Sequence, residues 1–172
     1  MVKDYTIDFI ITGGTIDSYY EVTTETTMPN KRSAIPDFIR ILRLYEKCRF
    51  TTVCMKDSRN LTLSDRRKIL AAVKKSISGK IIITHGTYTL PTTAKYIEAN
   101  LEKTNKTIVF VCSMIPLAGF IPTDAGFNIG YAIAKLQDLP AGIYVCMNGR
   151  IFAPEEVFKN IAEGRFGSIY TR

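Results

Sequence analysis

The chain has 172 residues, of which 46% are hydrophobic and 23% are charged, as expected for one globular domain over residues 1–172 with a core of its own. No apolar run reaches the roughly 18 residues that a membrane helix needs, and the first residues are too polar for a signal peptide, so we expect a cytoplasmic protein that does not bind membranes. The net charge of +7 is spread over most segments, which argues against nucleic-acid binding and suits an anionic small-molecule substrate.

Apolar segments alternate with amphipathic ones along the chain. In order, the pattern predicts a strand at residues 6–11, a helix at 36–45, a strand at 49–54, a helix at 64–77, a strand at 80–84, a helix at 89–101, a strand at 107–112, a helix at 124–136 and a strand at 140–146. Ser64 is the expected N-cap of the second helix and Gly79 its stop. We therefore predict an α/β fold with a doubly wound, mostly parallel, Rossmann- or flavodoxin-like sheet and helices on both faces.

Two long connections interrupt this alternation. Residues 18–32 are polar and rich in Thr and Tyr, and residues 113–122 contain two prolines and a glycine. Long loops inside a compact domain are often lids or binding loops. The first connection follows Thr15 closely, so we expect it to be a loop that closes over a site there.

Metal and disulfide chemistry is not indicated. The chain has one His and four Cys, and no two cysteines form a CxxC pair. Cys112 and Cys146 lie inside apolar runs, which favours buried, reduced thiols. Five basic residues gather in one segment, where they are expected to form the solvated face of a helix: Arg66, Arg67, Lys68, Lys74 and Lys75.

Two turns of small residues stand behind predicted strands. Residues 12–16 read TGGTI, and residues 84–89 read THGTYT. Because the carboxyl ends of parallel strands line the ligand crevice, Thr15 and Thr87 are expected to face one pocket. Glycines at positions 13 and 14 let backbone amides come close to a ligand. Two Thr hydroxyls with a Lys elsewhere suit nucleophilic attack on an amide without a His base.

These turns resemble the two signature motifs of the bacterial-type L-asparaginases, TGGTI and HGTDT. Three further stretches match in order. Residues 57–62 resemble the family's substrate-binding loop, residues 123–128 resemble the segment that opens a helix after the fourth strand, and residues 147–159 resemble the stretch with the catalytic Lys. The resemblance covers nearly the whole chain and implies the fold of the family's N-terminal domain.

The resemblance also implies a reaction, the hydrolysis of L-asparagine to L-aspartate and ammonia through an acyl-enzyme. Thr15 corresponds to the nucleophile, and Thr87 with Lys159 corresponds to the pair that orients water. A Tyr of the loop after Thr15 is expected to assist it, and we prefer Tyr20 to Tyr19.

The substrate-binding residues follow from the same resemblance. Backbone amides near Gly14 and Gly86 are expected to stabilise the oxyanion. Asp57 and Ser58 match the loop that holds the amino-acid backbone of the substrate. No cofactor and no metal is required. A homodimer or homotetramer is expected, because the family builds its sites between subunits.

Several of these residues also have a structural interpretation. Thr15 can be a turn residue, Lys159 a solvated surface Lys, and Asp57 the start of an Asx turn. For Asp124 the role of helix N-cap is favoured. His85 is expected to be a structural hydrogen-bonding residue rather than a base.

The sequence departs from the family pattern at two points. Tyr88 stands where the family has an Asp that contacts the α-ammonium group, so Asp57 or a partner subunit would have to replace that contact. The family's smaller C-terminal domain has no counterpart in these residues, which indicates a short single-domain form. Three other functions stay open: hydrolysis of another amide such as glutamine or a non-amino-acid amide, a subunit that supplies ammonia to a partner, and a binding module without turnover.

Overall fold

The central sheet has the topology that the alternating pattern predicts. The computed structural model describes residues 5–170, and the polar residues 1–4 used in the signal-peptide argument lie outside this range. Within it, the sheet runs in the order β4 (Lys47–Lys56), β1 (Thr6–Gly13), β5 (Lys80–Thr84), β6 (Thr107–Val111), β7 (Gly142–Met147) and β8 (Arg150–Phe152). The first five are parallel and β8 is antiparallel to β7. Apart from β8, this is the flavodoxin-like order, so the predicted fold class is confirmed.

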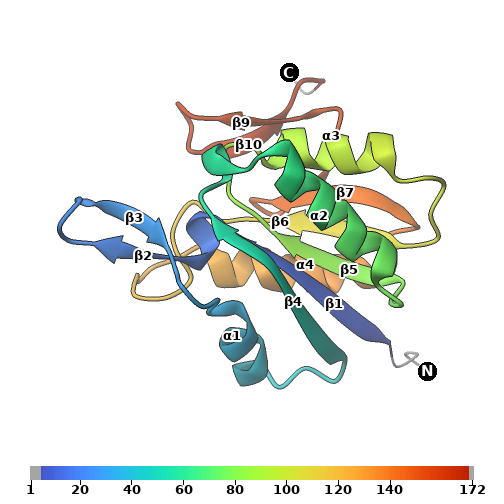
Figure 1. Cartoon of the computed structure of the whole chain (residues 1–172), viewed down its shortest axis with the longest axis horizontal. Coiled ribbons are helices and arrows are strands. Elements are labelled where there is room, and N and C mark those ends of the chain that lie inside the picture. The colour runs from blue at the N-terminus through green and yellow to red at the C-terminus, as the bar shows by residue number, and fades with distance from the viewer. Residues whose placement is uncertain (1–4, 171–172) are drawn as a thin grey trace.

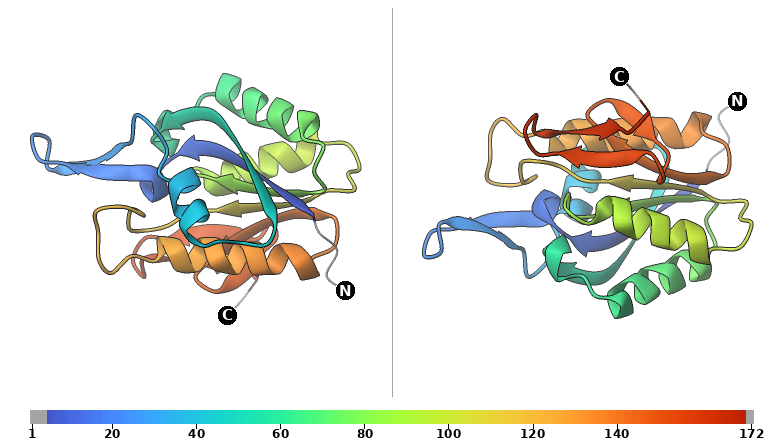
Figure 2. Two further views of the ribbon diagram at one scale, coloured as in Figure 1. Left: turned by 90° about the horizontal axis from the view of Figure 1, so that it is seen from below. Right: turned by 90° about the horizontal axis from the view of Figure 1, so that it is seen from above.

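Helices cover both faces of the sheet (Figures 1 and 2). One apolar cluster joins α2 (Leu63–Lys75) and α3 (Leu90–Asn100) to the sheet, and a second joins α1 (Ile35–Ile41) and α4 (Ala125–Asp138) to its other face. The strands between these two layers are almost fully buried, as in β6, where all five residues are buried. That double burial is why the inner strands are continuous apolar runs in the sequence.

Two hairpins lie outside the sheet. β2 (Ser18–Glu21) and β3 (Thr26–Pro29) form one that projects away from the sheet, and β9 (Val157–Asn160) with β10 (Arg165–Ser168) forms the other beside α3 (Figure 1). The prediction of a loop at residues 18–32 was therefore wrong. Its Thr and Tyr residues favour a strand, but both faces of this hairpin are largely solvated, so no burial alternation marks it in the sequence.

Two helix boundaries also differ from the prediction. α1 ends at Ile41, because Arg43 adopts a left-handed backbone conformation with φ 52°. α2 is capped by Thr62 instead of Ser64, and it ends at Lys75, before the expected stop. Thr62 forms a capping box with Asp65, in which each side chain bonds the other residue's backbone amide.

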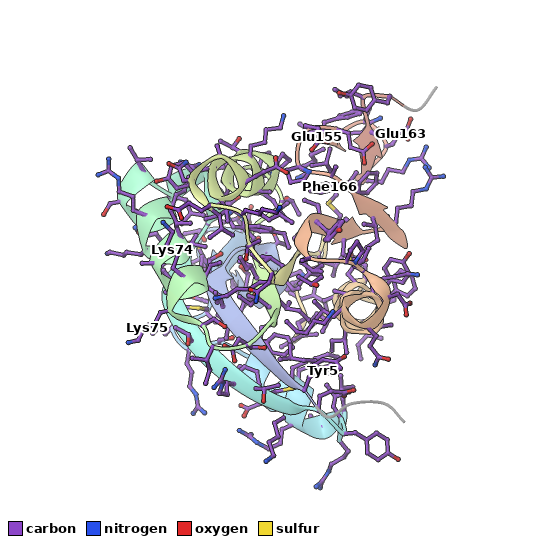
Figure 3. All side chains as sticks on the ribbon, turned by 90° about the vertical axis from the view of Figure 1, so that its right-hand side faces the viewer. Tyr5, Lys74, Lys75, Glu155, Glu163 and Phe166 are labelled. Carbon is purple, nitrogen blue, oxygen red and sulfur yellow. The ribbon has the colours of Figure 1, made fainter. Side chains whose placement is uncertain are left out.

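The right-hand side of the molecule in Figure 1 shows the outer faces of α2 and of the β9–β10 hairpin. Figure 3 views this side, with Lys74 and Lys75 on the outer side of α2 and Glu155 and Glu163 near the β9–β10 hairpin. Both lysines are exposed, as expected for a solvated helix face. Cys112 and Cys146 are free and buried, as expected. Among the helices of residues 5–170, none has the length and apolarity to cross a bilayer.

Candidate functional site

The two Thr turns meet at the point where the winding of the sheet reverses. β1 is hydrogen-bonded on one side to β4 and on the other to β5. The connection from β1 to β4 runs through α1 on one face of the sheet, and the connection from β4 to β5 runs through α2 on the other face. The turn after β1 leads into the short helix η1 (Thr15–Asp17), and the turn after β5 leads into α3. The Thr12 hydroxyl donates a hydrogen bond of 2.8 Å to the carbonyl of Thr84 and joins the two strand ends. Such a switch point is where open α/β sheets bind ligands.

Two glycines allow the turns to touch through their backbones. Gly14 has φ 82° and ψ −177°, a conformation essentially restricted to glycine. A Cβ atom on Gly14 would lie 2.3 Å from the Cα and N atoms of Gly86. One on Gly86 would lie 2.7 Å from the Cβ and Oγ atoms of Ser58. The three segments that carry the candidate residues are therefore in direct contact, and this contact requires glycine at positions 14 and 86.

Thr15 is the first residue of η1 and is half-buried beside this contact. The amide of Gly14 is engaged, since it donates to the carbonyl of Lys56 at 2.8 Å. The Ser18 hydroxyl donates to the carbonyl of Gly14 at the same distance. These two bonds hold the turn in place.

Thr87 and Lys159 are brought together from opposite parts of the chain. The Lys159 Nζ lies 2.8 Å from the Thr87 Oγ1, although 72 positions separate them. Thr87 is only 2% exposed. Lys159 comes from β9, and the β9–β10 hairpin is anchored by the buried side chains of Val157 and Phe166 against the α3 side of the core. Burial is the main cause that lowers the pKa of Lys159, and the charge of Arg59 lowers it further.

Tyr88 packs between cationic groups at the rim of this pair. Its ring centroid lies 3.8 Å from the Lys159 Nζ and 4.9 Å from the Arg59 guanidinium carbon. Arg59 in turn binds Asp57 through Nε at 3.1 Å and Nη2 at 2.8 Å. The pKa of Asp57 is lowered, chiefly by these side-chain hydrogen bonds from Arg59. Asp57, Arg59, Tyr88 and Lys159 thus form one continuous cluster, called the rim cluster below.

Ser58 and Thr89 fix the loop that carries the rim cluster. Ser58, the first residue of η2 (Ser58–Asn60), is buried. The Thr89 hydroxyl donates to the carbonyl of Ser58 at 2.7 Å, and the Thr89 amide donates to the Ser58 Oγ at 3.3 Å. The Ser58 hydroxyl therefore supports the loop and the Thr87 turn at the same time.

One protein family matches nearly the whole length of this chain. The family model "Asparaginase, N-terminal" matches residues 6–167. The chain belongs to the asparaginase family. The resemblance drawn from the five motifs is therefore confirmed.

Individual asparaginases match the chain over part of their length. A glutaminase-asparaginase of Acinetobacter glutaminasificans is 36% identical over 102 residues, which are 58% of this chain and 30% of that protein. The thermostable L-asparaginase from Thermococcus kodakarensis has a TM-score of 0.84 at 24% identity, covering 97% of this chain and 52% of its own. A probable cytoplasmic L-asparaginase from Campylobacter jejuni has a TM-score of 0.76 at 23% identity, covering 96% and 52%. The chain thus spans about half the length of these asparaginase structures, which share its fold.

The two Tyr candidates are not brought to the nucleophile position. Tyr19 and Tyr20 lie on β2, where their side chains are 40% and 50% exposed. The Tyr19 hydroxyl donates to Glu21 at 3.2 Å. Tyr20 makes no hydrogen bond through its hydroxyl to any residue in 5–170. Contacts therefore join the Gly14, Gly86 and Ser58 segments of this asparaginase-family chain, and Thr87 to Lys159, while neither Tyr hydroxyl bonds Thr15 in the described residues.

His85 and Asp124 have structural partners. His85 is fully buried, and its Nδ1 lies 2.8 Å from the carbonyl of Gly86. Burial lowers its pKa to about 4, so it is neutral at pH 7. Asp124 stands at the N-cap of α4, but its side chain caps no amide there. Its carboxylate accepts from the amides of Met114 and Ile115 and ties the 113–122 loop to the helix. The expected N-cap hydrogen bond of Asp124 was wrong.

Sequence reasoning assigned no role to Arg59 or Thr89. Both lie inside the matched motifs, two positions after Asp57 and Thr87. The Asx turn expected at Asp57 is present, since its carboxylate accepts from the Arg59 amide at 2.8 Å. That turn brings the Arg59 side chain back onto the carboxylate, and this spacing is the signal that points to the pair.

Proposed function

We propose that this chain is an amidohydrolase that hydrolyses L-asparagine to L-aspartate and ammonia, with Thr15 as the nucleophile. The contact of 2.8 Å between the Lys159 Nζ and the Thr87 Oγ1 carries the proposal. A half-buried Lys beside a buried Thr at a switch point is a costly arrangement that a purely structural role does not require. The membership of the asparaginase family and the names of the relatives support the same activity.

In the first half of the reaction, the Thr15 Oγ attacks the side-chain amide carbon of the substrate. The carbonyl oxygen becomes an oxyanion, which backbone amides of the two Thr turns stabilise. The amide of Gly14 already donates to Lys56, so we assign this role to the amides that follow Gly14 and Gly86. The C–N bond breaks, the nitrogen takes the proton that the Thr15 hydroxyl gives up and leaves as ammonia, and an ester between Thr15 and the acyl group remains.

In the second half, water attacks the ester and releases the acid and free Thr15. Thr87 and Lys159 orient this water and hold its proton. A neutral Lys accepts a proton where an ammonium cannot, and the lowered pKa of Lys159 increases the neutral fraction of this side chain at any given pH. No metal or organic cofactor takes part in these steps.

Three further parts of the proposal concern the surroundings of the site. Tyr20 assists Thr15 after the β2–β3 hairpin has folded toward the substrate. Residues 1–172 act as a single domain, in a homodimer or homotetramer. The location is cytoplasmic, as the name of the Campylobacter jejuni relative states for that protein.

The test is ammonia release from L-asparagine by the purified chain and by Thr15→Ala and Thr87→Ala. Each variant should lose at least about a hundredfold in kcat while keeping the parent's circular dichroism spectrum and Tm. Thr92→Ala, at an exposed position of α3, is the matched control and should be unchanged. Full activity of Thr15→Ala would refute the assignment of the nucleophile.

A further inference from the structure

The rim cluster adjoins the Thr87–Lys159 pair, and it carries more positive than negative charge. It contains two cations, Arg59 and Lys159, and one carboxylate, Asp57. Their ring partner Tyr88 is neutral, so the cluster carries a net positive charge when Lys159 is protonated.

Asp57 is the carboxylate of this cluster, and Arg59 already occupies it. Its Oδ1 accepts from the Arg59 amide at 2.8 Å and Nε at 3.1 Å, and its Oδ2 accepts from the Arg59 Nη2 at 2.8 Å. A bidentate guanidinium is among the stronger partners of a carboxylate, and it already engages both oxygens of Asp57. An ammonium would find only the remaining lone pair of Oδ2, directly beside the positive charge of Arg59, so Asp57 is a poor receptor for it.

Two other groups can attract an ammonium, the Tyr88 ring and the carboxylate of Asp17 in η1. The Tyr88 ring attracts cations, but Lys159 and Arg59 already lie within 5 Å of its centroid. The Oδ1 of Asp17 accepts from Asn30 and from the amide of Ala34, and its Oδ2, which has no partner in the described residues, is buried, as is the whole residue. An ammonium beside the rim cluster would therefore meet cations, and the carboxylate oxygen without a partner is not exposed to it.

The same cluster should attract a carboxylate. The Arg59 side chain is 62% exposed, and its Nη1 donates to no residue in the described part of the chain. That nitrogen and the positive charge of Lys159 favour an anion.

We propose that this site takes monoamides of dicarboxylic acids that lack an α-ammonium group, with Arg59 binding the distal carboxylate and Tyr88 holding the two cations in place. This inference rests on the amidohydrolase activity proposed above and specifies its substrate class. L-asparagine is then a substrate of lower specificity, because its α-ammonium meets the cations of the rim cluster.

The test compares succinamate with L-asparagine, because the two molecules differ only in the α-ammonium group. We expect kcat/KM for succinamate to exceed that for L-asparagine by about tenfold or more. Arg59→Gln should lower this ratio at least about tenfold, since it weakens carboxylate binding and frees Asp57. Tyr88→Asp should lower it as well, by adding an anion beside the cations. Arg67→Gln, an exposed Arg of α2, is the matched control and should leave the ratio within about twofold of the parent.

A calorimetric titration of the products, succinate and L-aspartate, separates the two proposals. If neither amide is hydrolysed but succinate binds more tightly than L-aspartate, the preference of the rim cluster for acids without an α-ammonium group stands and the hydrolytic activity fails. If both amides are hydrolysed with a ratio of one or below, or if Arg59→Gln leaves the ratio unchanged, the substrate class is overturned and the activity stands. If no turnover occurs and L-aspartate binds as tightly as succinate, both proposals fail.

Discussion

Replacing Gly14 by Ala tests the contact on which the site is built. Gly14 has φ 82° and ψ −177°, and forcing a residue with a Cβ into that region costs about 1 to 3 kcal/mol. The new Cβ would also lie 2.3 Å from the backbone of Gly86, which cannot swing away as a side chain can. Overpacking of this kind costs about 1 to 3 kcal/mol more. We therefore expect Gly14→Ala to lose about 2 to 6 kcal/mol of unfolding free energy.

The measurement is urea unfolding followed by circular dichroism, with thermal unfolding as a second probe. For a chain of this size each kcal/mol shifts Tm by about 2 to 4 °C, so the expected fall is roughly 5 to 20 °C. Gly130→Ala is the matched control: it lies in α4 with no atom within 4 Å of the added Cβ. It should gain about 0.5 to 1 kcal/mol, since a mid-helix Gly is unfavourable. A loss below about 1 kcal/mol for Gly14→Ala would show that the two turns do not touch as described.

Three further predictions concern charged groups. Lys159→Met should lower kcat by a factor of about 10² to 10⁴. It should also remove the rise of kcat/KM with pH that the titration of Lys159 causes, and a pH–rate profile measures this rise. An unchanged profile would contradict the role of Lys159 with Thr87. His85, the one His of the chain, has its pKa lowered to about 4. Between pH 6.5 and about 4 the unfolded chain therefore binds a proton that the folded chain does not, so the parent loses stability as the pH falls through this window. His85→Gln has no such group to protonate, so the losses of unfolding free energy of the two proteins should differ by about 3 kcal/mol over this window. Asp65→Asn should lower the free energy of urea unfolding by about 1 to 3 kcal/mol, because it weakens the contact to Lys56 and the capping box. The parent should lose this stability as the pH falls from about 4 to about 2 through the lowered pKa of Asp65. Equal stability of parent and variant at pH 7 would contradict the stabilising role of Asp65.

The sheet and its covering helices were predictable from the sequence because burial leaves a strong pattern. Strands such as β5 and β6 are apolar throughout, since helices cover both of their faces. The β2–β3 hairpin was missed because its residues are mostly exposed and give no such pattern. Its tight connection also uses Glu25 with φ 49°, where the sequence has no Gly or Asn to mark a hairpin turn. That the chain is a single domain stays a prediction.

The positions of the two Thr turns could be predicted from the sequence, but the pairs of side chains that meet in the site could not. Gly14 and Gly86 follow apolar strands, so their positions at the strand ends come from periodicity alone. The pairing of Lys159 with Thr87 spans 72 positions and depends on how the β9–β10 hairpin packs, so only the family resemblance pointed to it. The pairing of Asp57 with Arg59 follows an Asx-turn spacing that is visible in the sequence, but the bidentate contact between the two side chains is seen only in the structure.

The rigidity of the Ser58 segment explains why a few side chains can set specificity here. Ser58 is held from two sides, by Thr89 through two hydrogen bonds and by Gly86 through direct contact, so the loop cannot shift to suit a different ligand. Because this loop is held in place, the charge of the rim cluster depends on which side chains the loop and the Thr87 turn carry. Arg59 can neutralise Asp57 because the Asx turn fixes both groups on one short helical turn, and Tyr88 can hold Lys159 because it follows Thr87 directly. A change at Arg59 or Tyr88 should therefore alter whether the site prefers amides with or without an α-ammonium group, while leaving Thr15 and the Thr87–Lys159 pair in place.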